Sequence, residues 1–124
     1  MPRKVLIAED NADTREALRL SLEMEGYVVR VASNGDEALR LQVTEPADVL
    51  VTDLFMPERD GFETLAAFRK NFPKTKIVAI SGDTARVRGR HYLQSAQMVG
   101  ADATLRKPIS PPDLLRVIEE LLRP

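Results

Sequence analysis

The sequence contains no cysteine and no tryptophan. Without cysteine the chain has no disulfides and no thiol nucleophile, which fits a reducing compartment such as the cytoplasm. No apolar run reaches the ~18–20 residues of a membrane span, and the first residues lack the pattern of a secretory signal. The formal net charge of −1 argues against a general nucleic-acid binder, which usually carries a basic excess. We therefore expect a cytoplasmic protein that binds neither membranes nor nucleic acid directly.

Short apolar segments alternate with longer amphipathic ones along all 124 residues. The apolar segments are mostly rich in valine, isoleucine or leucine, as in strands that are covered on both faces. Strands are predicted over residues 4–8, 27–32, 48–53, 76–80 and 101–106. Helices are predicted over residues 12–25, 35–43, 62–70 and 90–99, with a last helix that follows residue 110. Five β–α units in a chain of this length predict a single α/β domain with a parallel sheet and helices on both faces.

Two helix boundaries are marked by their residues. Gly26 follows the first amphipathic segment, and glycine commonly stands just beyond the end of a helix. Ser110 precedes Pro111, and Asp113 comes three residues after the serine. A serine cap, a proline in the first position and an acid in the third are all favourable at a helix start. The last helix is therefore predicted to have Ser110 as its N-cap.

Polar residues end several of the predicted strands. Glu9 and Asp10 follow the first strand, and Asp53 ends the third. Ser81 follows the fourth strand, and Lys107 follows the fifth. Ligands of open parallel sheets bind beyond the carboxyl ends of the strands, so these residues are predicted to gather at one edge. Each residue alone is also what an ordinary polar loop contains, and the prediction depends on their coincidence at that edge.

Three carboxylates at one edge repel each other and are costly to desolvate unless a cation is present. Their hard oxygen atoms, with no histidine or cysteine nearby, favour Mg²⁺ or a similar ion such as Mn²⁺. Lys107 supplies a second positive charge, and the Ser81 hydroxyl can donate a hydrogen bond to an oxyanion. Such a site suits a phosphoryl group bonded to a carboxylate, because carboxylates are established covalent nucleophiles. We predict Asp53 as the nucleophile, because it stands alone at the centre of the edge.

Several stretches, taken together and in order, resemble one known family. They are Glu9-Asp10, the segment DLFMPERDG at 53–61, Ser81-Gly82 and the segment GADATLRKP at 100–108. With the α/β alternation they resemble the receiver domain of two-component response regulators over essentially the whole chain. The resemblance implies a flavodoxin-like, doubly wound (βα)5 fold with a five-stranded parallel sheet in the order 2-1-3-4-5. It also implies that residues 1–124 form a single receiver domain, with no output domain in this chain.

The resemblance assigns a role to each matching position. It makes Asp53 the phosphoacceptor. It makes Ser81 and Lys107 the residues that bind the phosphoryl group and switch with it. It places Mg²⁺ on the side chains of Glu9, Asp10 and Asp53 and on the backbone carbonyl of Phe55.

Two further implications concern backbone geometry and chemical lifetime. The peptide between Lys107 and Pro108 matches one that is cis in the family, whereas sequence alone predicts a cis bond for only ~5–6% of X-Pro pairs. Phe55 and Asp83 occupy positions that tune the lifetime of the acyl phosphate in the family. The direction of that effect stays open, since a bulky apolar group excludes water while an acid can orient it.

Two features depart from the family pattern. Three residues before Lys107 the family usually has tyrosine or phenylalanine, whose ring moves inward with the switch, and here the residue is Thr104. The aromatic relay is therefore in doubt or replaced by a smaller motion. The segment 82–92 is longer and more basic than usual, with arginines at 86, 88 and 90. These arginines suit either a solvated loop or a contact with a partner or the phosphoryl group.

The implied function is a signalling switch rather than an enzyme, beyond self-catalysed phosphoryl transfer and autodephosphorylation. A histidine kinase or phosphotransfer protein would phosphorylate Asp53, and the added charge and acceptor atoms would draw in the loops of Ser81 and Lys107. If the closed form is a minor state beforehand, the phosphoryl group shifts the population toward it. The fourth helix, fifth strand and fifth helix would form the surface that an output domain or partner protein reads. Homodimerisation through the same surface stays open.

Three other interpretations deserve comparison. A pseudo-receiver that is not switched by phosphorylation would keep the fold, and Thr104 keeps this interpretation open. An Asp-nucleophile phosphatase of the haloacid-dehalogenase type would need a second acid two residues after Asp53, where Phe55 stands. A flavodoxin-type cofactor binder would need a first loop that cradles a phosphate, which Glu9 and Asp10 would repel unless a metal intervened.

Overall fold

The computed structural model describes residues 2–54, 61–81 and 100–124. Its strands are β1 (Lys4–Ala8), β2 (Val28–Ala32), β3 (Val49–Asp53), β4 (Lys76–Ser81) and β5 (Ala103–Arg106). The helices within the described residues are α1 (Ala12–Met24), α2 (Gly35–Thr44), α3 (Gly61–Asn71) and α5 (Pro111–Leu122). The predicted helix over 90–99 lies outside the described residues. Elsewhere the predicted boundaries agree with the structure to within about two residues, the usual uncertainty of such limits.

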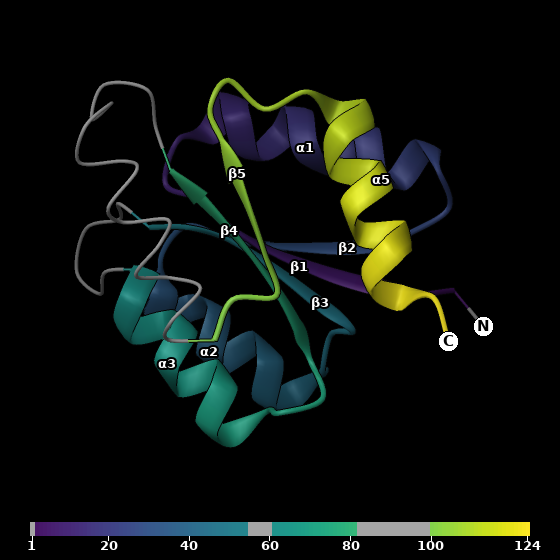
Figure 1. Ribbon diagram of the computed structural model, residues 1–124. Helices are drawn as coiled ribbons and strands as arrows, with labels where there is room; N and C mark the ends of the chain where they lie inside the picture. Colours follow the sequence, from purple (N-terminus) through teal and green to yellow (C-terminus); the bar gives the residue numbers. More distant parts are fainter. Residues whose placement is uncertain (1, 55–60, 82–99) are drawn as a thin grey trace.

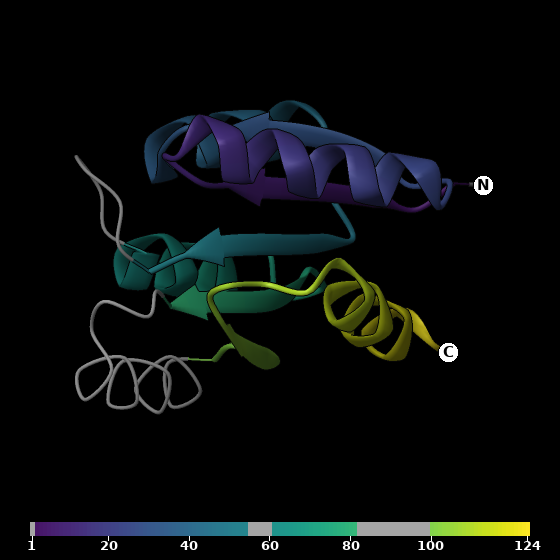
Figure 2. The ribbon, with the colours of Figure 1, turned by 90° about the horizontal axis from the view of Figure 1, so that it is seen from above.

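The five strands form one parallel sheet in the order β2-β1-β3-β4-β5, as predicted (Figure 1). Helices α1 and α5 cover one face of the sheet, and α2 and α3 cover the other (Figures 1 and 2). The chain reverses its winding direction between β1 and β3, which are neighbours in the sheet. In open α/β sheets the crevice beyond the carboxyl ends of the strands at this reversal is the usual ligand site.

The core consists of two apolar clusters, one on each face of the sheet. In β1, Val5 and Ile7 pack toward α1 and α5, whereas Leu6 and Ala8 pack toward α2 and α3. Alternate residues of a strand point to opposite faces, so a central strand that is covered on both faces is expected to be largely apolar. This explains why β1, β3 and β4 appear in the sequence as nearly continuous apolar runs. Packing on both faces fixes the positions of the central strands, and therefore of the residues at their carboxyl ends.

Side-chain caps mark where three of the described helices begin. Ser110 accepts a hydrogen bond from the backbone N–H of Asp113 at 3.5 Å, which confirms the predicted N-cap of α5. Asn11 and Asn34 cap α1 and α2 through bonds of 2.9 Å to the N–H groups of Thr14 and Glu37. The longest described helix, α1, has 13 residues. Within the described residues, no helix combines the length and apolar character needed to cross a bilayer.

Candidate functional site

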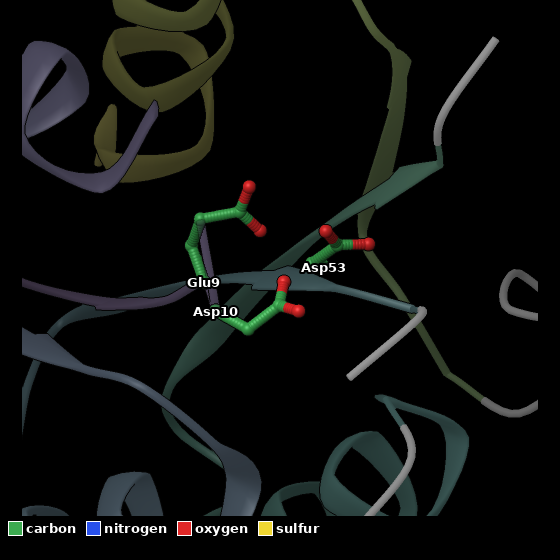
Figure 3. A group of neighbouring side chains, drawn as sticks. All are labelled: Glu9, Asp10 and Asp53. Carbon is green, nitrogen blue, oxygen red and sulfur yellow. The ribbon is translucent and has the colours of Figure 1, made fainter. Parts of the chain in front are cut away.

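Three carboxylates meet at the carboxyl edge of the sheet. Glu9 and Asp10 follow β1, and Asp53 is the last residue of the neighbouring strand β3. One carboxylate oxygen of each residue lies within 4.8 Å of the other two. Figure 3 shows the three side chains directed into a common space. The structure therefore brings together the three acids whose proximity the strand pattern predicts.

Burial divides these acids into two kinds. Glu9 is only 2% exposed and Asp53 only 4%, whereas Asp10 is exposed to solvent. The backbone fixes both buried acids, because the Glu9 N–H donates to the Ala32 carbonyl at 3.0 Å and Asp53 is paired in register with Ile80. The carboxylates of Glu9 and Asp53 are therefore buried at the edge of the sheet, and that of Asp10 faces solvent. A cation that reaches this cluster can therefore be bound without being fully dehydrated.

Lys107 follows the edge strand β5, and its side chain contacts both buried acids. Its Nζ donates to Asp53 Oδ2 at 2.8 Å and to Glu9 Oε1 at 2.5 Å. Its backbone N–H donates to the Ser81 carbonyl at 2.8 Å, which ties the segment after β5 to the end of β4. One ammonium group therefore neutralises part of the charge of two buried carboxylates. Such a pair would otherwise be strongly unfavourable.

The ionisation of the site follows from this arrangement. Burial raises the pKa of Glu9 to about 8, and its hydrogen bond with Asp53 adds to the rise while Lys107 opposes it. Burial alone would lower the pKa of Lys107, but hydrogen bonds with Asp53 and Glu9 outweigh that effect and raise it. The lysine therefore stays charged. A carboxyl pKa displaced this far by burial and a named neighbour is typical of functional sites.

Two buried polar atoms have no hydrogen-bond partner within the described residues, namely Glu9 Oε2 and Ser81 Oγ. Buried polar atoms are nearly always paired, so each such exception calls for an explanation. Ser81 is the last residue of β4, one position beyond Ile80, the register partner of Asp53. Both atoms belong to residues at the carboxyl edge, and a cation and an oxyanion bound there would satisfy them.

Of the other predicted site residues, the structure describes Thr104 and the Lys107–Pro108 peptide. Thr104 is in β5, paired with Ala79, and is partly buried. The Lys107–Pro108 peptide bond is cis. Phe55, Asp83 and the basic segment 86–90 lie outside the described residues, so their predicted roles remain predictions.

Sequence reasoning missed two residues that contact the site. The Arg15 guanidinium in α1 donates to the Glu9 carbonyl at 2.9 Å. The second is Gly61, where a Cβ would lie 2.4 Å from the Asp53 carbonyl oxygen. The Gly61 N–H also donates to the Leu54 carbonyl at 3.1 Å. A basic residue in the first turns of the helix after the acids was the one available signal for Arg15.

An open groove runs beside the site. It has a volume of about 470 Å³ and lies between α1 and the segment that joins β5 to α5. It is lined by Thr14, Ala17, Leu18, Lys107, Pro108, Ile109 and Pro111. Lys107 lines this groove and also contacts Glu9 and Asp53 of the acidic cluster.

The fold and this edge define an α/β domain whose carboxyl edge holds an acidic pocket and an opposing lysine. The chain belongs to the response regulator receiver domain family, whose model matches residues 5–119. This agrees with the family that the sequence motifs resemble.

Known proteins similar to this chain support the same assignment. An uncharacterised 14.6 kDa protein of Leptolyngbya boryana is 39% identical over 116 residues, which are 94% of this chain and 87% of that protein. The response regulator MprA of Mycolicibacterium vanbaalenii is 35% identical over 99% of this chain and 52% of MprA. The solved structure of the chemotaxis response regulator CheY4 of Vibrio cholerae superposes with a TM-score of 0.86. It is 31% identical, over 98% of this chain and all of CheY4.

Several of the relatives are about twice as long as this chain, which limits the functions that can be transferred from them. It spans about half the length of MprA and of several transcriptional regulators that it matches. The remaining half of those proteins has no counterpart in the 124 residues. The similarity therefore supports the receiver function and not the output of any whole regulator.

Proposed function

We propose that this receiver domain accepts a phosphoryl group on Asp53, with Mg²⁺ in the acidic cluster, and changes its partner-binding surface in response. The observation that carries this proposal is the contact of Lys107 with both Asp53 and Glu9, beside two buried polar atoms that have no partner among the described residues. Burying two acids beside a partly exposed lysine costs stability, so we take the arrangement to be kept for a function. A site for a cation and a phosphoryl group accounts for all of these groups together.

The residues present fit a magnesium ion. Glu9, Asp10 and Asp53 offer oxygen atoms within 4.8 Å of one another, and Mg²⁺ prefers one or two carboxylates together with water and phosphate oxygens. Glu9 Oε2, which has no hydrogen-bond partner in the described part of the chain, and the exposed Asp10 carboxylate leave ligand atoms available to it. When bound, Mg²⁺ would supply neutralisation of the charge on the transferring phosphoryl oxygens.

The protein's own groups perform the transfer. A carboxylate oxygen of Asp53 attacks the phosphorus atom, an O–P bond forms, and the bond from phosphorus to the donor's leaving group breaks with its electron pair. Lys107, already hydrogen-bonded to Asp53, is placed to donate to a phosphoryl oxygen after the transfer. The Ser81 hydroxyl, buried and without a described partner, would donate to another oxygen. Donors aimed at developing charge in a partly dry site are the main source of such catalysis.

The switch would follow from these new contacts. Closure of Ser81 and Lys107 on the phosphoryl group pulls on the ends of β4 and β5 and shifts a pre-existing equilibrium. The surface of β5, α5 and the region between β4 and β5 would then change toward an output partner. Thr104 has no aromatic ring that could move inward, so we propose a smaller displacement along β5.

The family, rather than the geometry, supports a histidine kinase or phosphotransfer protein as donor and the cytoplasm as location. The groove between α1 and the β5–α5 segment adds one structural argument. It is open, largely apolar and lined in part by Lys107, the residue that contacts Asp53, so a partner bound there would lie near the proposed phosphoacceptor.

Phosphorylation can be tested with a small acyl-phosphate or phosphoramidate donor and Mg²⁺. Mass spectrometry should show one added phosphoryl group per wild-type chain and none on Asp53→Asn. Asp13→Asn, an exposed acid in the first turn of α1, is the matched control and should be modified like wild type. A wild-type chain that stays unmodified would refute the proposal. Turnover of a generic phosphomonoester would instead favour a phosphatase.

Metal binding predicts a second, independent result. At a concentration of about 100 times its Kd, Mg²⁺ should stabilise the wild-type fold by ~2.7 kcal/mol. Asp10→Asn should lose most of this gain, yet without Mg²⁺ it should be at least as stable as wild type, because one of three crowded acids is neutral. Thermal unfolding with and without Mg²⁺ measures both effects. An equal gain in Asp10→Asn and wild type would place the ion elsewhere.

A further inference from the structure

Within the described residues, Arg15 contacts the backbone of the acidic cluster and forms no ion pair with Glu9, Asp10 or Asp53. Its Nη1 donates to the backbone carbonyl of Glu9 at 2.9 Å. An arginine near three carboxylates would be expected to form an ion pair, the usual arrangement for partly buried opposite charges. Here the guanidinium donates instead to the peptide group that joins Glu9 to Asp10, the two adjacent acids of the site.

The backbone of Arg15 holds the other end of the same loop. Its N–H donates to the Asn11 carbonyl at 2.9 Å and closes the first turn of α1. Asn11 in turn caps the helix through the N–H of Thr14. Side chain and backbone of Arg15 therefore bracket residues 9–11. With the Glu9 N–H bonded to the Ala32 carbonyl, both sides of Glu9 are fixed and Asp10 lies between two anchored points.

Adjacent residues of an extended chain direct their side chains to opposite sides. Glu9 and Asp10 nevertheless bring carboxylate oxygens within 4.8 Å of each other and of Asp53. The chain must leave the strand conformation between them, and the hydrogen bond from Arg15 holds it in that turn. The neighbouring buried acid, Asp53, is fixed by strand pairing and needs no such support.

We propose that Arg15 is a positioning residue for the metal site, which holds the Glu9–Asp10 peptide so that the acids can bind the ion together. This inference rests on the proposed function. The hydrogen bond should raise Mg²⁺ affinity by orienting the ligands, although the guanidinium charge itself opposes a divalent cation. The sign of the effect on affinity therefore distinguishes orientation from charge.

Calorimetric titration of the unphosphorylated chain with Mg²⁺ tests the inference. Arg15→Ala should weaken Mg²⁺ binding roughly 10-fold, the loss typical when a group that orients a metal ligand is removed. Arg15→Lys, which keeps a donor on a long side chain, should recover much of that loss. Arg19→Ala is the matched control, since Arg19 stands one turn further along α1 and pairs with Glu16 and Glu23. It should bind Mg²⁺ like wild type.

A second measurement separates orientation from general damage. Thermal unfolding without Mg²⁺ should show Arg15→Ala folded, with a midpoint only slightly below that of wild type, because one hydrogen bond is lost while alanine suits a helix. Unchanged or tighter Mg²⁺ binding by Arg15→Ala, or an equal loss in Arg19→Ala, would overturn the inference alone. A wild-type chain that does not bind Mg²⁺ would overturn the proposed function and this inference with it.

Discussion

Lys107→Met is expected to slow phosphoryl transfer from a small donor to Asp53 about 100-fold, the loss typical when one preorganised donor to a developing oxyanion is removed. The lysine Nζ lies 2.8 Å from Asp53 Oδ2 and 2.5 Å from Glu9 Oε1. Methionine keeps most of the length and apolar volume of lysine, so the packing around the stem changes little. The ammonium charge is what disappears.

The effect should be large because nothing else described replaces that charge. Glu9 and Asp53 are both buried, and within the described residues Lys107 provides the one cationic group bonded to either side chain. Without it, the phosphoryl group would arrive beside two acids with only a bound metal ion to balance their charge. The transferred group would also lose the donor that links the phosphorylated state to β5.

Arg106→Met is the matched control for this experiment. Arg106 is the neighbouring residue, also cationic, but it is exposed and lies at the end of β5 opposite Ser81 in the register. Its replacement removes the same charge from the same edge without touching the acids. Time courses of phosphorylation, followed by mass spectrometry at saturating Mg²⁺, should show a near-normal rate for Arg106→Met. Equal rates for the two variants would mean that Lys107 contributes only a positive charge to the electrostatic field at the carboxyl edge, and not a specific hydrogen bond.

The fold could be predicted from the sequence because each central strand is buried on both faces. A strand such as β3 must be largely apolar on both faces, and its run of valine and leucine gives way to Thr52 and then Asp53 at the carboxyl end. The edge strand β5 was harder to delimit: it was predicted over 101–106 but spans Ala103–Arg106, and none of its residues is fully buried. The strand order came from family resemblance, because apolar runs carry no information about which strands are neighbours.

The candidate site was predictable to the extent that it consists of strand ends. Glu9, Asp53 and Lys107 all stand where an apolar run stops, and parallel strands carry such positions to one edge. The bridging contact of Lys107 with Glu9 was not predictable, since it depends on side-chain reach across the intervening strands. Arg15 was missed for a related reason, because its partner is a backbone carbonyl and no side-chain pattern reports such a contact.

Gly61→Ala is expected to destabilise the fold by about 3 kcal/mol, at the upper end of the usual cost of overpacking. A Cβ at this position would lie 2.4 Å from the Asp53 carbonyl oxygen and 2.4 Å from the Leu54 Cα. Both are backbone atoms of a buried strand end, so neither can rotate away. Either α3 or the end of β3 must move, and the latter carries the proposed phosphoacceptor.

Gly26→Ala provides the comparison that makes this prediction specific. Gly26 has a φ of 92°, but a Cβ there meets no atom within 4 Å, so alanine should cost only the ~1–2 kcal/mol of a left-handed backbone. Urea unfolding measures both losses, and phosphorylation by a small donor should be slowed in Gly61→Ala alone. If Gly61→Ala were no less stable than Gly26→Ala and phosphorylated normally, the close approach of α3 would have no role in holding Asp53. The expected result instead ties the first residue of α3 to the geometry of the site, because the helix can approach Asp53 this closely only where it has no side chain.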